Sequence, residues 1–362
     1  MSRTAFRRWR LAVIAAAAAT ALTAAGALTP ALAATGPSMT VNHGSVNIAV
    51  PGPHNSLRFY WAVNGTAAWN PETVAGPGTT YSAPAMTVNG DSVNIAAEGP
   101  DHSLQFYWAA NGTATWHAET VAGPGTTYSA PSITANGNIV NIAVQGPDHS
   151  LQFYWAFDGT TTWHVETVAG PGTTFSAPSI TINGNAANIS AVEADGTLMF
   201  YWAVYGTGTW HAEAVASNVT DAAPSMVATG NAVNIAAAGA GGRLMFYWAY
   251  NGTGTWHPET VAGIGTTYTS PSISVNNGGA NIAAVSPKGY LRFYWAIYGT
   301  GTWHPETVAG EGTIISAPSI TANGNAANIS AVGAGDQLNF YWAVNGTPTW
   351  NAETVAGFGS VR

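Results

Sequence analysis

One block of sequence recurs seven times in this chain at an almost constant spacing. A Phe-Tyr-Trp triplet begins at Phe59 and returns in steps of 47 residues, apart from one step of 46. A second Trp follows eight residues after each triplet, and a Glu always stands three residues after that Trp. A fixed period in the forties is typical of repeat architectures, in which no unit buries its own faces alone. The sequence therefore predicts one closed or stacked body.

Each repeat contains four strand-like runs, seen for example at 131–135, 139–144, 151–156 and 163–168. The third and fourth runs are joined by Asn-Gly or a variant of it, which is a strong hairpin signal. This pattern predicts an all-β, seven-bladed β-propeller with four antiparallel strands per blade and the fourth strand outermost. An open β-solenoid is the alternative, but it would need end units of different sequence. The expected repeats are 37–83, 84–130, 131–177, 178–223, 224–270, 271–317 and 318–362.

The first 33 residues have the pattern of a secretory signal peptide. Four arginines precede an Ala-rich apolar run, and Ala31-Leu32-Ala33 provides a small-residue cleavage site. Pro30 and several Thr residues interrupt the run, which disfavours the alternative of an uncleaved membrane anchor. We expect a secreted, extracellular domain of residues 34–362. Whether strands from both termini share one blade stays open at this level.

The charge balance and the absence of Cys limit the partners. Removing the leader leaves five basic residues against 17 acidic ones, a net charge of about −12. Nucleic acid and anionic membrane surfaces are therefore poor partners. No Cys is present, so packing rather than disulfides must stabilise the fold. Five His recur one to a blade and cannot form a compact cluster, so we expect no metal and no cofactor.

The recurring aromatics fall into two groups. Trp61, Trp108 and their equivalents lie in the third strand, where we expect them to pack between blades, each removing roughly 150–250 Å² from water. The second Trp lies near the outer strand beside a carboxylate, and between them stands His in five repeats and Asn in two. The candidate binding residues are Trp69, Glu72, Trp116, His117, Glu119, Trp163, His164, Glu166, Trp210, His211, Glu213, Trp256, His257, Glu259, Trp303, His304, Glu306, Trp350 and Glu353.

Seven Glu recur without a recurring cation, which leaves two interpretations of these carboxylates. A buried Glu would accept hydrogen bonds from Trp, Tyr or backbone N–H groups. An accessible Glu beside a flat aromatic face would suit a neutral sugar, whose C–H side covers the ring while its hydroxyls bond to the carboxylate. Seven such sites on one rigid body would gain affinity on a glycan-coated surface through effective concentration.

The roughly 47-residue repeat, with its two Trp, its Glu, its Val-Ala-Gly turn and its Ser-Ala-Pro-Ser entry, resembles bacterial seven-bladed propeller lectins. Five-bladed tachylectin-like propellers are a looser match. The resemblance covers the whole chain after the leader and implies a lectin that binds fucose and related sugars in pockets between blades. An Arg commonly joins the Glu and the aromatics in fucose-binding propellers, which points to Arg58 and Arg292 as further candidates.

Two other classes of function remain as alternatives. A propeller glycosidase would need one set of catalytic groups placed once, and no repeat carries a unique cluster of acids and histidines. A non-catalytic scaffold that binds another secreted protein, or a further copy of this chain, is the second alternative. Near-identical repeats favour a lectin over either, with glycans as partners and no membrane insertion.

Overall fold

The structure is a computed structural model that describes residues 36–276 and 278–362. The expected leader, residues 1–33, lies outside the described residues. The described chain forms 28 strands in seven sheets of four, and every sheet is built from four consecutive strands. Two 3-10 turns, η1 (Pro53–Asn55) and η2 (Pro147–His149), lie between the second and third strands of their blades.

The strands occupy four equivalent positions in the seven blades. The innermost strands are β1 (Ser38–Asn42), β5 (Ala85–Asn89), β9 (Ser132–Asn136), β13 (Ser179–Asn183), β17 (Ser225–Thr229), β21 (Ser272–Asn276) and β25 (Ser319–Asn323). The second strands are β2 (Ser45–Gly52), β6 (Ser92–Glu98), β10 (Ile139–Gln145), β14 (Ala186–Val192), β18 (Ala232–Gly239), β22 (Gly279–Val285) and β26 (Ala326–Gly333). The third strands are β3 (Ser56–Val63), β7 (Leu104–Ala110), β11 (Leu151–Phe157), β15 (Leu198–Val204), β19 (Arg243–Tyr250), β23 (Leu291–Ile297) and β27 (Gln337–Val344). The outer strands are β4 (Asn70–Ala75), β8 (His117–Ala122), β12 (His164–Ala169), β16 (His211–Ala216), β20 (His257–Ala262), β24 (His304–Ala309) and β28 (Asn351–Ala356).

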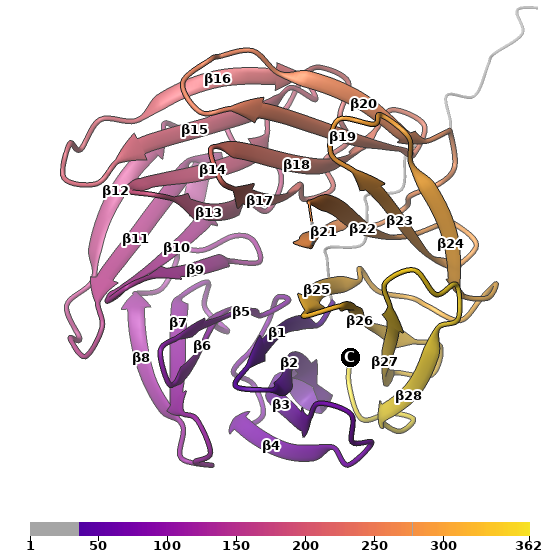
Figure 1. The fold of residues 1–362 in the computed structure, drawn as a ribbon. Coiled ribbons are helices and arrows are strands. Elements are labelled where there is room, and N and C mark those ends of the chain that lie inside the picture. The colour runs from indigo at the N-terminus through magenta and orange to yellow at the C-terminus, as the bar shows by residue number, and fades with distance from the viewer. Residues whose placement is uncertain (1–35, 277) are drawn as a thin grey trace, which may run out of the picture. The chain divides into compact units, whose positions relative to one another are not determined.

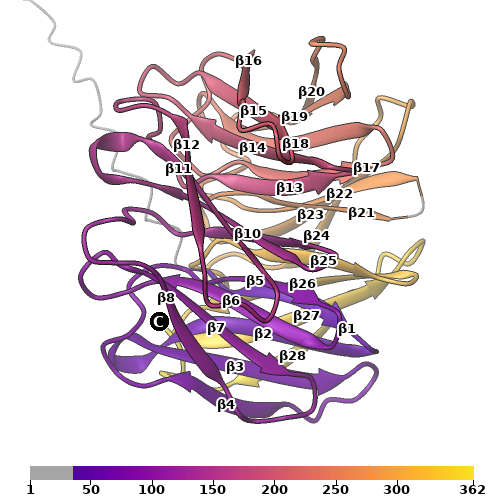
Figure 2. The same cartoon turned by 90° about the vertical axis from the view of Figure 1, so that its left-hand side faces the viewer.

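The seven sheets form a closed propeller ring, as Figure 1 shows. Neighbouring innermost strands contact one another in cyclic order from β1 to β25, and β25 contacts β1 again. This closure confirms the predicted propeller and excludes an open solenoid. Seen from the side in Figure 2, the strands run between two faces. One face carries the hairpin turns between third and outer strands, and the other carries the connectors between blades, which bond to the turns between second and third strands.

Among residues 36–276 and 278–362, no strand is exchanged at the seam between the first and the last blade, and packing closes the ring there. The backbone N–H of Met39 donates to Ser319 Oγ at 3.0 Å, as in other blade interfaces. Val361 is 3% exposed in the core cluster shared by these two blades. The N–H of Arg362 donates to the carbonyl of Pro51 at 2.9 Å. The C-terminal residues thus take the place that a connector has elsewhere.

The hydrophobic core consists of seven clusters, each lying between two neighbouring blades. Side chains alternate along each third strand because successive residues of a strand point to opposite faces. Phe106 therefore packs toward the next blade with Ile142, whereas Tyr107 packs toward the preceding blade with Leu57. This alternation decides which residues can meet between blades.

Candidate functional site

Each recurring Glu links two indoles that belong to neighbouring blades. Glu306 accepts the N–H of Trp295 from its own blade on Oε1 and the N–H of Trp350 from the next blade on Oε2, both at 2.9 Å. We call this arrangement a Trp–Glu–Trp bridge, and its fourteen N···O distances lie between 2.8 and 3.3 Å. The bridges are Trp61–Glu72–Trp116, Trp108–Glu119–Trp163, Trp155–Glu166–Trp210, Trp202–Glu213–Trp256, Trp248–Glu259–Trp303, Trp295–Glu306–Trp350 and Trp342–Glu353–Trp69.

The strand pattern explains why these three side chains meet. In blade 6, Phe293 pairs across the sheet with Glu306, and Trp295 lies two residues further along the same strand face. Trp350 precedes the outer strand of the next blade and packs edge-on against Phe293, with ring centroids 5.0 Å apart at 65°. The same Phe–Trp contact recurs at all seven interfaces. The second Trp therefore donates its hydrogen bond to the Glu of the preceding blade, not to the Glu that follows it three residues later in sequence.

Three of the bridges, those of Glu166, Glu213 and Glu306, border cavities that lie between blades near the hairpin face. A cavity of about 330 Å³ between blades 6 and 7 is lined by Trp295, Glu306, Trp350 and the turn at 345–347. Equivalent cavities of about 410 and 240 Å³ lie between blades 3 and 4 and between blades 4 and 5. Phe, Trp and aliphatic side chains line these cavities together with a few polar groups. This combination is typical of small-molecule sites.

Sequence reasoning missed the Asn residues of these cavities. One Asn occupies the same place in all seven second strands and is buried in each: Asn47, Asn94, Asn141, Asn188, Asn234, Asn281 and Asn328. Asn188 and Asn281 line cavities together with Asn183 and Asn276 of the innermost strands. The amide nitrogens of several, including Asn47 and Asn94, bond to no other described residue. The signal was available, because a polar residue recurs within an otherwise apolar buried strand.

The five candidate His lie outside the three cavities. His304 stacks on Trp295 with centroids 4.1 Å apart at 21°, and the four other His stack on their own blade's triplet Trp in the same way. All five are exposed. They are His117, His164, His211, His257 and His304, and they cover an outer surface of the indole rather than lining the cavity.

The two candidate arginines lie on the opposite blade face from the bridges. Arg58 and Arg292 each directly precede the Phe of a triplet, so the pleat points them away from Glu72 and Glu306. The guanidinium Nη1 of Arg58 donates to Thr73, and that of Arg292 donates to Thr307. The structure therefore does not join either Arg to a Trp–Glu–Trp bridge.

The bridging carboxylates have no cationic partner. The ion pairs among the described residues are His43–Asp91 and His102–Glu98, at 3.5 and 2.6 Å. The indole N–H groups provide the neutral donors that a half-buried Glu needs, which agrees with the interpretation of these Glu residues as hydrogen-bond acceptors from Trp. Each carboxylate oxygen accepts one of them and keeps a further lone-pair direction. The two interpretations are compatible, because the same Glu borders a cavity.

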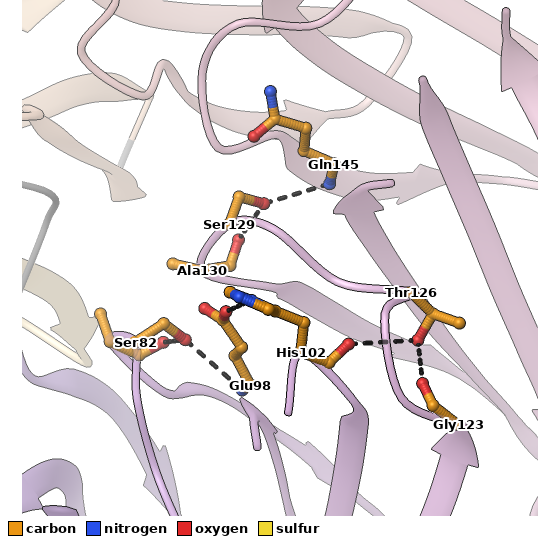
Figure 3. A network of polar contacts seen from close by, with 9 residues as sticks. Ser82, Glu98, His102, Gly123, Thr126, Ser129, Ala130 and Gln145 are labelled. Carbon is orange, nitrogen blue, oxygen red and sulfur yellow. Dashed lines mark hydrogen bonds and ion pairs between the residues drawn. The ribbon is translucent and has the colours of Figure 1, made fainter. Parts of the chain in front are cut away.

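One buried carboxylate stands outside the repeat pattern. Glu98 lies at the end of β6, where the next blade has Gln145, and Figure 3 shows Glu98 beside His102 and Gln145 beside Ser129. His102 Nδ1 lies 2.6 Å from Glu98 Oε1 and its ring stacks on Tyr128. Burial raises the pKa of Glu98, and the neighbouring His102 opposes this rise in part. Gln145 makes the equivalent contact in its own blade, with Nε2 2.6 Å from His149 Nδ1, and it also donates to the carbonyl of Thr174 at 2.5 Å.

Neither a metal cluster nor a membrane-spanning helix is found in the part of the chain that the structure describes. No three His, Asp or Glu side chains of residues 36–276 and 278–362 are grouped so that they could hold a metal ion. In those same residues, no helix is long and apolar enough to cross a bilayer.

Comparison with known proteins identifies the fold. No protein-family model and no curated protein sequence matches the chain. The BP39L lectin from Burkholderia pseudomallei has a similar structure, with 18% identity and a TM-score of 0.81 over 90% of this chain and 99% of that one. A mutant of the Aleuria aurantia lectin in complex with α-methyl-L-fucoside has 10% identity and a TM-score of 0.56 over 76% and 96%. A prolyl endopeptidase has 11% identity and a TM-score of 0.60 over 90% and 50%. At these identities the likeness shows the seven-bladed β-propeller fold.

Proposed function

We propose that the protein is a secreted, multivalent lectin that binds neutral sugars in the cavities between its blades and catalyses no reaction. The observation that carries this proposal is the Trp–Glu–Trp bridge, which recurs at all seven blade interfaces and borders a cavity at three of them. Indole and phenyl faces can cover the C–H side of a sugar ring, while carboxylate and Asn groups bond to its hydroxyls.

The state of the carboxylate favours a neutral ligand over a charged one. Glu306 has both indole donors in place and no cation nearby, so it can accept a hydroxyl without breaking an ion pair. An anionic ligand would meet an uncompensated negative charge at the same place. Among the described neighbours, the lectin solved with α-methyl-L-fucoside supports fucose or a related sugar as the ligand.

The cavities differ, so we expect unequal affinities. The hairpin turn contributes Asn345 to the cavity between blades 6 and 7, whereas blade 4 contributes Tyr205 to the cavity between blades 3 and 4. The weak sites would act together on a glycan-coated surface, where binding at one site raises the effective concentration at the next.

A glycan array on residues 34–362 tests this proposal. Glu→Gln variants at Glu166, Glu213 and Glu306, made singly and together, should lower avidity stepwise. Glu193→Gln is the matched control, because it removes a carboxylate that lies in no bridge. Binding to no glycan, together with co-purification of a secreted protein, would favour the scaffold alternative. Hydrolysis of a bound glycan would contradict the absence of catalysis.

A further inference from the structure

A fourth cavity, of about 460 Å³, lies on the connector face between blades 5 and 6, at the opposite end of β23 from the Trp–Glu–Trp bridge. Its walls include Lys288, Tyr290, Arg292 and Tyr294, together with the connector at 265–266. The guanidinium of Arg292 lies over the ring of Tyr290, 5.1 Å from its centroid. Hydroxyl donors and two cations therefore border one hollow.

The concentration of positive charge here is unusual for this chain. The sequence after the leader holds five basic residues against 17 acidic ones, and two of the five border this cavity. One acid is close, since Glu311 Oε2 accepts the hydroxyl of Tyr290 at 2.9 Å from the following connector. Lys288 and Arg292 together outweigh it, so the cavity is locally positive on an acidic protein.

Comparison of the blades shows that this set of residues occurs once. The place of Lys288 is held by Asp101, Asp148 and Asp195 in blades 2 to 4, which reverses the charge. The place of Tyr290 is held by Ser, Thr, Arg or Gln in the other blades. Blade 1 shares only the arginine: Arg58 makes the same bond to its outer strand, but Ser56 stands where blade 6 has Tyr290. A binding site needs its groups placed only once, and blade 6 alone combines Lys288, Tyr290 and Arg292 at these positions.

We propose that this cavity binds an anionic oxygen group, a carboxylate, sulfate or phosphate, of a small solute. Arg292 and Lys288 supply the charge, and a guanidinium is suited to planar or tetrahedral oxygen anions. Ser286 and Thr266 add hydroxyl donors at the rim. This site does not depend on the sugar sites, since it lies at the other face of the propeller and binds anions rather than neutral sugars.

The experiment titrates residues 34–362 with sodium acetate, sulfate and phosphate at constant ionic strength, following backbone amide NMR shifts. At least one anion should bind saturably and shift signals near the cavity, and the most strongly bound anion identifies the class. Arg292→Gln and Lys288→Gln should each weaken binding about 10-fold, the usual scale for one charge-assisted contact. Constant ionic strength matters because screening alone changes with added salt.

Arg58→Gln is the matched control, because it removes the same charge and the equivalent Thr bond in a blade without Lys288 or Tyr290. It should leave anion binding unchanged. Absence of saturable binding for all three anions would overturn the proposal. Equal weakening by Arg58→Gln and Arg292→Gln would also overturn it, because net charge rather than a site would then explain the effect.

Discussion

Replacing Glu306 by Gln tests whether the Trp–Glu–Trp bridges hold neighbouring blades together. The carboxylate accepts two indole N–H groups at 2.9 Å, one on each oxygen. A Gln side chain keeps one oxygen but places an NH₂ group against the second indole donor. One hydrogen bond is therefore lost, and the other loses its charge assistance.

The expected loss can be estimated from typical hydrogen-bond contributions. A bond to a charged group contributes about 1.5–3 kcal/mol and a neutral bond about 0.5–1.5 kcal/mol. Because Glu306 is half-buried, water and solvent screening replace part of the loss, and we expect about 2 kcal/mol. An unfolding entropy of about 2.1 cal/mol/K per residue over roughly 330 residues converts this to a Tm about 3 °C lower.

Differential scanning calorimetry of residues 34–362 measures this shift. Glu193→Gln changes the net charge equally without touching an indole, and it should leave Tm within about 1 °C. If Glu306→Gln and Glu193→Gln melt at the same temperature, the carboxylate does not stabilise the interface and the reasoning above is refuted.

Three further perturbations give expected outcomes. Burial raises the pKa of Glu98, so the protonated side chain stabilises the fold below the unfolded-state pKa and this stabilisation is lost as pH rises through the folded-state pKa. The variant Glu98→Gln, which copies Gln145, should therefore raise the free energy of unfolding by about 1 kcal/mol at pH 7 and by less below about pH 4. Thermal melts at several pH values measure this difference. Val361→Ala removes two buried methyl groups at the seam and should cost about 2 kcal/mol, measured by denaturant unfolding. His117→Ala exposes one face of Trp108 but should leave glycan affinity within about twofold by calorimetric titration, whereas a loss of binding would place His117 in the site.

The repeat made the fold predictable from sequence. The period, the turn signals and the alternation of Phe59, Tyr60 and Trp61 fix the strands and their faces without any long-range information. The way in which the seam of the ring is closed was not predictable in the same way, because it depends on how Val361 and Arg362 pack against the first blade. Such contacts join the two ends of the chain, and no local pattern specifies them.

The sequence predicted which residue types recur at the candidate site, but it did not predict which blades bring them together. Trp303 and Glu306 are close in sequence, yet Trp303 donates to Glu259 of the preceding blade, and Glu306 receives Trp350 of the next. The sequence also assigned the triplet Trp to packing and the second Trp to binding, but Trp295 of the triplet borders the same cavity as Trp350. The orientation of Arg292 could have been predicted from strand alternation, because a residue directly before Phe293 points to the opposite face of the sheet.

The most direct test of the central claim observes the indole N–H groups themselves. Every Trp after the leader donates to one of the seven carboxylates, so the ¹H–¹⁵N signals of these indoles report on the bridges alone. During titration of residues 34–362 with L-fucose and other neutral monosaccharides, we predict that a subset of indole signals shifts and saturates for at least one sugar, while Glu306→Gln removes the shifts of Trp295 and Trp350. If the indole signals stay unchanged with every sugar, the Trp–Glu–Trp bridges do not border a sugar site, whether or not a glycan binds elsewhere on the protein.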